Sequence, residues 1–464
     1  MKTRDLAAFD SRLEEFLDDL TASLGRRDRQ NWAGAYVQGL LLDGERKSIE
    51  PLAGRIGLED DVQNLRQFVS QSPWSADLVQ AAMAGKAARL WPVPQAWIID
   101  ETSFPKAGKH SVGVARQYCG ALGKIANCQV AVTLHYAGQS AGGVPGSAAL
   151  GWRLLLPQSW AEDPERRAKA HVPEDVRHLT MNEHALDLVI EAQERGLPAA
   201  PVLADSAYGD DYGFRAGLRE PGCAYCVAVD PCAKAWQEAP PELAPGARRK
   251  PGQEELPVPL TLEQIAMGLP RGAYHSLTLR PGTKAVLEGR FACVPVWAAH
   301  GHTQRRHRGQ RACEWLLMEW PKGEPTPFKY WLASLASEQD PAPEAPGLKD
   351  LVLLAKGRFQ VEQDYRELKE EVGLDHFEGR HWLGWHHHVT LASMAHLFLG
   401  SERLRLAEAT ARHAKKEPGW RAGASRAEAV QAWHSELAGD PAQVAGSAYP
   451  PKRALSLVPG PLPA

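Results

Sequence analysis

Apolar residues recur at three- and four-residue steps through the first part of the chain, and this spacing predicts a series of amphipathic helices. Residues 13–24 follow the pattern just after Ser11 and Glu14, whose separation is that of a helix-capping box. The same pattern returns over 32–42, 62–70 and 76–88. We therefore predict a helical domain over 1–90. Its basic turns leave two interpretations open, a DNA-binding domain and a plain helical scaffold.

A different pattern begins after Pro94, where short apolar runs replace the helical spacing. Two of these runs, 96–100 and 201–205, each end in an aspartate, which is typical of a buried strand with a carboxylate at its end. Further strands are predicted over 110–117, 128–134, 150–156 and 224–229, and helices over 182–195 and 212–218. This alternation of strands and helices predicts a mixed α/β core that begins with 91–230.

The segment 231–345 is rich in Pro and Gly and has short strand-like pieces, so we predict a β-rich insertion there. The pieces cover 274–279, 290–297 and 315–320. Helical spacing returns over 347–372 and 385–398, which we assign to the rest of the core, 346–400. The remaining 401–464 is predicted to be a charged helical stretch with a Pro-rich end.

The amino-acid composition is consistent with this predicted domain organisation. The chain has 464 residues, of which 44% are hydrophobic and 23% charged, as in a folded protein with a sizeable core. Its net charge of −3 does not by itself indicate a nucleic-acid binder, but basic residues gather in short runs. These runs are 25–29, 248–250, 305–308 and 412–416. Each is either a solvated surface loop or part of a DNA-binding face.

Other features bear on location and metal binding. The sequence has no run of about 18 apolar residues and no apolar leader, and its seven cysteines are irregularly spaced. We therefore expect a cytoplasmic protein. Cys223 and Cys226 form a CxxC without an obvious second pair, so a buried strand cysteine is favoured over zinc.

Acidic residues at the two strand ends suggest a site for a hard cation. Asp100 and Asp205 are oxygen ligands of the kind that Mg²⁺ prefers. The helix predicted over 358–369 carries Arg358, Glu362, Arg366 and Lys369 on one face. That face is either an exposed surface with ion pairs or one metal-binding carboxylate flanked by phosphate-binding cations.

Several linked segments resemble the DDE transposases of bacterial insertion sequences, and most of all the insertion-sequence family numbered seven-hundred-one. These segments are 98–106, 110–118, 203–209, 358–380 and 385–388. The resemblance implies an RNase H-like α/β catalytic core interrupted by a β-rich insertion, with a helical domain before it and a helical region after it.

The same resemblance implies a set of site residues. Asp100, Asp205 and Glu362 would be the catalytic metal ligands, holding two Mg²⁺ ions for which Mn²⁺ can substitute. Related transposases carry a Tyr, Arg, Glu, Lys signature on the helix of the third acid. Arg358, Glu362 and Lys369 match it, whereas Ala355 stands at the tyrosine position.

Some assignments around this site stay open. Arg358, Lys369 and Arg366 are the expected DNA-phosphate contacts. Glu367 is the main rival of Glu362, because it lies on the same helix; the other nearby acids that could be mistaken for ligands are Glu101, Asp210 and Asp364.

The resemblance further implies cut-and-paste transposition. A homodimer would bind the inverted-repeat ends of an insertion sequence, cleave them and join the 3′-hydroxyl ends to target DNA, in association with the nucleoid. Two other hypotheses remain. One is a transposase-derived DNA-binding protein that no longer cuts. The other is a metal-free hydrolase with a carboxylate pair, which would stay active in chelator.

Overall fold

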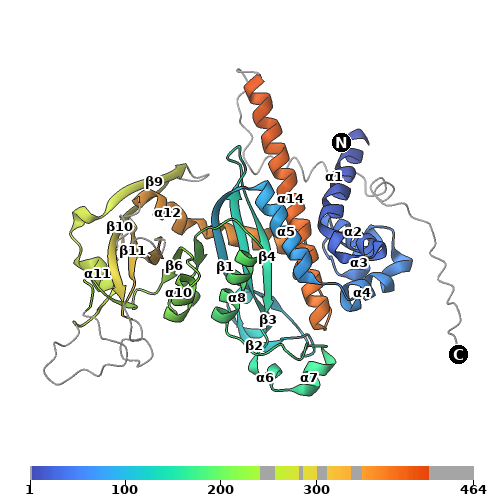
Figure 1. The fold of residues 1–464 in the computed structure, drawn as a ribbon, viewed down its shortest axis with the longest axis horizontal. Coiled ribbons are helices and arrows are strands. Elements are labelled where there is room, and N and C mark those ends of the chain that lie inside the picture. Colours follow the sequence, from blue (N-terminus) through green and yellow to red (C-terminus); the bar gives the residue numbers. More distant parts are fainter. Residues whose placement is uncertain (1–2, 241–256, 282–285, 300–310, 336–346, 417–464) are drawn as a thin grey trace.

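A computed structural model describes residues 3–240, 257–281, 286–299, 311–335 and 347–416 (Figure 1). Three expectations fall outside these residues: the basic runs 248–250 and 305–308, and the Pro-rich end. Among the helices of the described ranges, none combines the length and the apolar character needed to cross a bilayer.

The core is a mixed sheet with the strand order β4-β3-β1-β5-β6. β1 (Val93–Pro105), β3 (Lys124–Gln139) and β4 (Pro145–Leu154) are antiparallel neighbours, whereas β5 (Val202–Ala204) and β6 (Tyr225–Val229) run parallel to β1. Helices between these strands complete the α/β arrangement. The predicted fold class, an RNase H-like α/β core, is thereby confirmed.

The β-rich region continues this sheet instead of forming a separate one. β12 (Lys329–Ser334) pairs antiparallel with β6, and β11 (Cys313–Trp320) and β10 (Val286–Ala298) follow in order. Beyond them, β7 (Lys234–Trp236) and β9 (His275–Pro281) pair with different parts of β10, and β8 (Leu260–Thr261) pairs with β7. Figure 1 shows these yellow strands at the opposite end of the molecule from the blue N-terminal helices.

The four predicted N-terminal helices are present, with one further short helix between the second and the third, and as a group they pack against one long helix, α14 (Trp382–Lys416). They are α1 (Thr3–Thr21), α2 (Arg27–Leu41), α3 (Ile49–Arg55), α4 (Val62–Gln71) and α5 (Ala76–Leu90). Tyr36 of α2 bonds His388 at 2.9 Å, and Gln80 of α5 donates to Thr390 at 2.9 Å. A single apolar cluster runs from these helices through α14 into the sheet. The assignment of 1–90 to DNA binding stays a prediction.

The remaining elements occupy the connections. They are β2 (Ala115–Cys119), α6 (Gln158–Ala161), α7 (Pro164–Lys169), α8 (Met181–Glu194), α9 (Ser206–Gly209), α10 (Tyr212–Arg219), α11 (Leu262–Gly268), α12 (Leu348–Gly357) and α13 (Phe359–Glu370).

Several predicted elements have other bounds in the structure. The first helix begins at Thr3, so Ser11 and Glu14 lie inside α1 and do not form a capping box at its start. The strand predicted over 110–117 begins only at Ala115, because Gly113 adopts a left-handed turn (φ +71°) before it. The helix predicted over 347–372 is divided at Arg358 into α12 and α13. Cys223 and Cys226 are buried free thiols, as expected for strand packing.

Candidate active site

Asp100 and Asp205 lie level with each other on adjacent parallel strands. Ile98 of β1 is in register with Leu203 of β5, and each aspartate comes two residues later. The prediction that Asp100 ends its strand is wrong, because β1 continues to Pro105. The longer strand β3 pairs with that extension, from Asp100 opposite Thr133 onward. Asp205, in contrast, directly follows β5 as predicted.

Asp205 divides its two oxygens between two roles. It is the N-cap of α9, and its Oδ1 accepts a hydrogen bond from the backbone N–H of Ala207 at 3.0 Å. Its Oδ2 lies 3.6 Å from Nη2 of Arg358. The cap therefore fixes the carboxylate in place while leaving one oxygen directed toward other charged groups.

A third carboxylate, that of Glu101, joins this pair. One oxygen from each of Asp100, Glu101 and Asp205 lies within 4.8 Å of the other two. Successive strand residues point to opposite faces, so the sequence offers no reason to group Glu101 with Asp100. From the sequence, Glu101 is expected to be a nearby acid outside the ligand set. In the structure it belongs to the acidic cluster.

The electrostatics of this cluster fit a divalent cation. Burial raises the pKa of Asp100 to about 7; Arg358 opposes that rise, and the nearby Glu101 and Asp205 add to it. Burial also raises the pKa of Glu101, with a further contribution from Asp205. Glu101 Oε2 is buried and has no hydrogen-bond partner among the residues that the structure describes. The negative charge of these three carboxylates is only partly compensated by Arg358. Their oxygens therefore form a donor set suited to Mg²⁺ or Mn²⁺.

Arg358 bridges the two aspartates. Its Nη1 donates to Asp100 Oδ2 at 3.3 Å, and its Nη2 approaches Asp205 Oδ2. The sequence predicts that Arg358 binds a DNA phosphate, whereas here its guanidinium offsets the repulsion between the carboxylates. It reaches them from the junction of α12 and α13.

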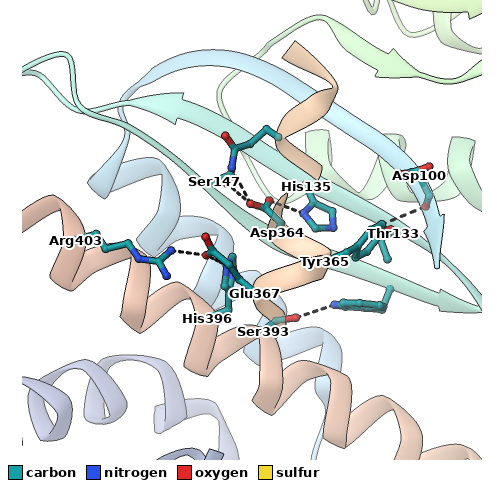
Figure 2. A network of polar contacts seen from close by, with 12 residues as sticks. Asp100, Thr133, His135, Ser147, Asp364, Tyr365, Glu367, Ser393, His396 and Arg403 are labelled. Atoms are coloured by element: carbon teal, nitrogen blue, oxygen red, sulfur yellow. Dashed lines mark hydrogen bonds and ion pairs between the residues drawn. The ribbon is translucent and has the colours of Figure 1, made fainter. Parts of the chain in front are cut away.

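The helix α13 presents one face to β1, the strand of Asp100, and to β3 beside it. Tyr365 hydrogen-bonds Thr133, whose hydroxyl donates to the carbonyl oxygen of Asp100 at 3.2 Å (Figure 2). Lys369 Nζ donates to the Ser103 carbonyl at 3.3 Å. These contacts hold the strand of Asp100 against the helix.

Glu362 belongs to the same face of α13 by its position. At about 100° per residue, it lies about 20° from Lys369 and about 60° from Tyr365 around the helix. Its side chain is exposed, and it is not among the three acids that lie within 4.8 Å of one another. Arg366, the other predicted phosphate contact, is also exposed.

Glu367 lies about 140° around the helix from Glu362 and faces α14. Its Oε2 lies 3.1 Å from His396 Nε2 and forms an ion pair with Arg403 (Figure 2). Burial would raise the pKa of Glu367, but the hydrogen bond from His396 and the charge of Arg403 outweigh it and lower the pKa to about 2. These contacts attach α13 to α14.

The other neighbouring acids also have partners within the protein. Asp364 is buried between His135 Nδ1 at 2.8 Å and Ser147 Oγ at 2.6 Å (Figure 2). Asp210 accepts a hydrogen bond from the backbone N–H of Asp230 at 2.8 Å. Their hydrogen bonds give both acids a structural role.

We predict that Glu367→Gln destabilises the protein. The lowered pKa corresponds to about 3 kcal/mol of stability at neutral pH, as an order of magnitude. A carboxylate with a depressed pKa stabilises the fold above its unfolded pKa, so the difference from wild type should shrink as pH falls from 4.5 towards 2. Urea unfolding at several pH values measures it. Glu370→Gln, an exposed position on α13, is the control, and equal stability of both variants would contradict the prediction.

Comparison with known proteins places these residues in a family context. A family model described as "DDE superfamily endonuclease" matches residues 19–286, which is more than half of the chain and includes Asp100 and Asp205. A curated relative from Microchaete diplosiphon, "Probable transposase for insertion sequence element IS701", is 32% identical over 200 residues. That alignment covers 41% of this chain and 46% of the relative, so the chain matches less than half of the relative's length.

Proposed function

Because the chain belongs to the DDE superfamily endonucleases, we propose that it is a metal-dependent transposase that binds the inverted-repeat ends of an insertion sequence, cleaves them and joins the 3′-hydroxyl ends to target DNA. The observation that carries this proposal is the cluster of Asp100, Glu101 and Asp205 oxygens within 4.8 Å. A partly buried cluster of carboxylates with too little compensating charge is suited to metal-assisted phosphoryl transfer.

In this proposal Asp100 and Asp205 hold the cations, and Glu362 completes the set from α13. Bound Mg²⁺, two ions per site, would activate the attacking oxygen and stabilise the leaving oxygen of the phosphodiester. Glu362 is suited to this role because its exposed side chain is free to rotate and shares the face of α13 that meets β1. Glu101 would supply a further oxygen beside Asp100.

Arg358 would then change partners. With cations bound to Asp100 and Asp205, the charge of the Arg358 guanidinium would not be needed to compensate the two carboxylates. Its paired N–H donors would then suit the oxygens of a DNA phosphate. Lys369 and Arg366 would contact the same backbone from the next turns of α13. The positive side chains of one helix face would thus orient the phosphodiester over the carboxylates.

The wider assignments follow from the same reaction. The partners would be double-stranded transposon ends and target DNA. Joining two ends requires that they be held together, for which a homodimer is the simplest arrangement. A protein with these substrates would work at the nucleoid.

The test is a cleavage assay on duplex DNA that carries the inverted repeats flanking the coding sequence. Mg²⁺ or Mn²⁺ should support strand cleavage that leaves 3′-hydroxyl ends, and EDTA should abolish it. Cleavage that persists in EDTA would instead fit a metal-free carboxylate pair. Binding without cleavage in either metal would fit a DNA-binding protein that no longer cuts. Both results would overturn the proposal.

A further inference from the structure

The connection between β1 and β3 has an unusual charge. No acidic residue occurs between Glu101 and Glu162, although the chain as a whole carries a net charge of −3. The same stretch contains Lys106, Lys109, Arg116 and Lys124 before the middle of β3. Lys106 donates to the Phe377 carbonyl close to Asp375 and Glu378, whereas Arg116 and Lys124 are exposed. These two exposed cations give the connection a local positive charge that attracts a polyanion.

The hairpin formed by β2 and the start of β3 also exposes large apolar side chains. Tyr118 is 64% exposed, Ile125 is 61% exposed and Leu122, at the tip, is 48% exposed. Tyr118 and Ile125 are directly opposite each other across the two strands, and Arg116 lies two residues from Tyr118 on the same face. Single exposed apolar residues are ordinary, whereas a cluster of them marks a contact surface.

This hairpin is fixed to the catalytic strand. Ser103 Oγ accepts a hydrogen bond from the backbone N–H of Ala121 at 3.0 Å and lies 3.4 Å from Cys119 Sγ. The carbonyl of Ser103 is also the group that receives Lys369 Nζ. Ser103 follows Asp100 by three residues, which is about 10 Å along a strand. The tip therefore lies beside the candidate active site.

We propose that this hairpin, residues 115–125, contacts the DNA next to the phosphate that is cut. Arg116 and Lys124 would bind flanking phosphates, while Tyr118, Leu122 and Ile125 would insert against an opened base step. Aromatic and apolar side chains that protrude beside cations are suited to stacking on exposed bases. The inference rests on the proposed function, since it takes the DNA substrate from it.

Duplex DNA is favoured over a protein partner by the charge of this surface. A second copy of this chain would bring a net charge of −3 distributed over many residues, whereas DNA brings a dense row of phosphates. The attachment of the hairpin to Ser103, three residues from Asp100 on β1, also favours the substrate, because DNA bound at the carboxylates would extend to both sides of them.

The test uses the full-length protein and a terminal-repeat duplex with 2-aminopurine on either side of the cleavage point, in Ca²⁺ to follow binding without turnover. Wild type should raise 2-aminopurine fluorescence as the base unstacks. The variant Tyr118→Ala/Leu122→Ala/Ile125→Ala should lose this rise, and its cleavage in Mg²⁺ should fall by about tenfold or more. The matched control replaces three exposed apolar residues on other elements, Leu78→Ala/Ile190→Ala/Leu353→Ala, and should behave as wild type.

A second variant tests the cations. Arg116→Gln/Lys124→Gln should lower the slope of log binding constant against log salt by about two, as expected for two lost phosphate contacts. If wild type binds and cuts while the apolar variant keeps both the fluorescence rise and the cleavage rate, the inference is wrong and the proposed function stands. If the apolar variant changes only the oligomeric state, a second copy covers the tip, which also overturns the inference. If wild type neither binds nor cuts the duplex, both fail.

Discussion

Replacing Asp205 with asparagine is expected to abolish DNA cleavage while leaving the fold and DNA binding intact. Asparagine keeps the side-chain oxygen that caps α9 through the Ala207 N–H, so the local structure should persist. The negative charge beside Asp100 is lost, and with it the affinity for a divalent cation. Since metal assistance supplies several kcal/mol, we expect the cleavage rate to fall by about 10³-fold or more.

Cleavage of the terminal-repeat duplex and its binding, followed by fluorescence anisotropy, measure the two effects separately. Asp211→Asn is the matched control, because Asp211 caps the next helix, α10, through the Phe214 N–H at 2.9 Å. It lies outside the group of three acids and should leave cleavage near the wild-type rate. Cleavage by Asp205→Asn at the rate of this control would remove Asp205 from the active site.

Replacing Glu362 with glutamine is expected to have a similarly large effect on cleavage, about 10³-fold, with no change in the unfolding temperature. The side chain is exposed, so its substitution removes a proposed metal ligand without disturbing the packing of α13. A glutamine has nearly the same shape and lacks only the charge. Cleavage rates and thermal unfolding of the purified variant provide both readouts.

Glu367→Gln provides the contrasting result for the same helix. That change removes the partner of His396 and Arg403, so it should lower stability and leave substantial cleavage at temperatures where the variant is folded. The opposite pattern, with Glu367→Gln inactive but stable and Glu362→Gln fully active, would show that the acid proposed for the site is on the wrong face of α13.

The positions of Asp100 and Asp205 could be anticipated from the sequence because short apolar runs before an acid predict buried strands. Their closeness depends on the pairing of Ile98 with Leu203, which brings together parts of the chain about a hundred residues apart. The extent of β1 beyond Asp100 was missed because it is determined by its partner β3 and not by its own composition.

Glu101 and Arg358 show a different limit. Strand alternation separates Glu101 from Asp100, and only the three-dimensional arrangement reveals that their carboxylates converge. Helix spacing grouped Arg358 with Glu362 and Lys369, but it could not show that Arg358 contacts both aspartates. The local sequence pattern predicts which residues share a face of a helix. It does not predict which distant segment of the chain packs against that face.

The choice between the two acids of α13 illustrates the same point. Periodicity alone separates Glu362 and Glu367 by about 140° around the helix. It does not say which face meets the catalytic strand. The contacts of Glu367 with His396 and Arg403 answer this, because they turn that face toward α14.

The sequence predicted that the region 231–345 is rich in β-strands, but it did not predict that these strands extend the core sheet. β12 was missed because it is a short strand that follows Pro325 and Pro327 in a Pro-rich segment. Its pairing with β6 joins the insertion to the core sheet. An antiparallel pairing between such distant segments cannot be inferred from the local sequence of either strand.

The central claim is that Asp100 and Asp205 hold catalytic divalent cations. The most direct measurement is anomalous X-ray diffraction from crystals of the protein soaked in Mn²⁺. We expect anomalous density at the Asp100 and Asp205 carboxylates, with Arg358 displaced from both. A crystal with Mn²⁺ bound elsewhere, or with the Arg358 bridge intact at saturating Mn²⁺, would contradict it.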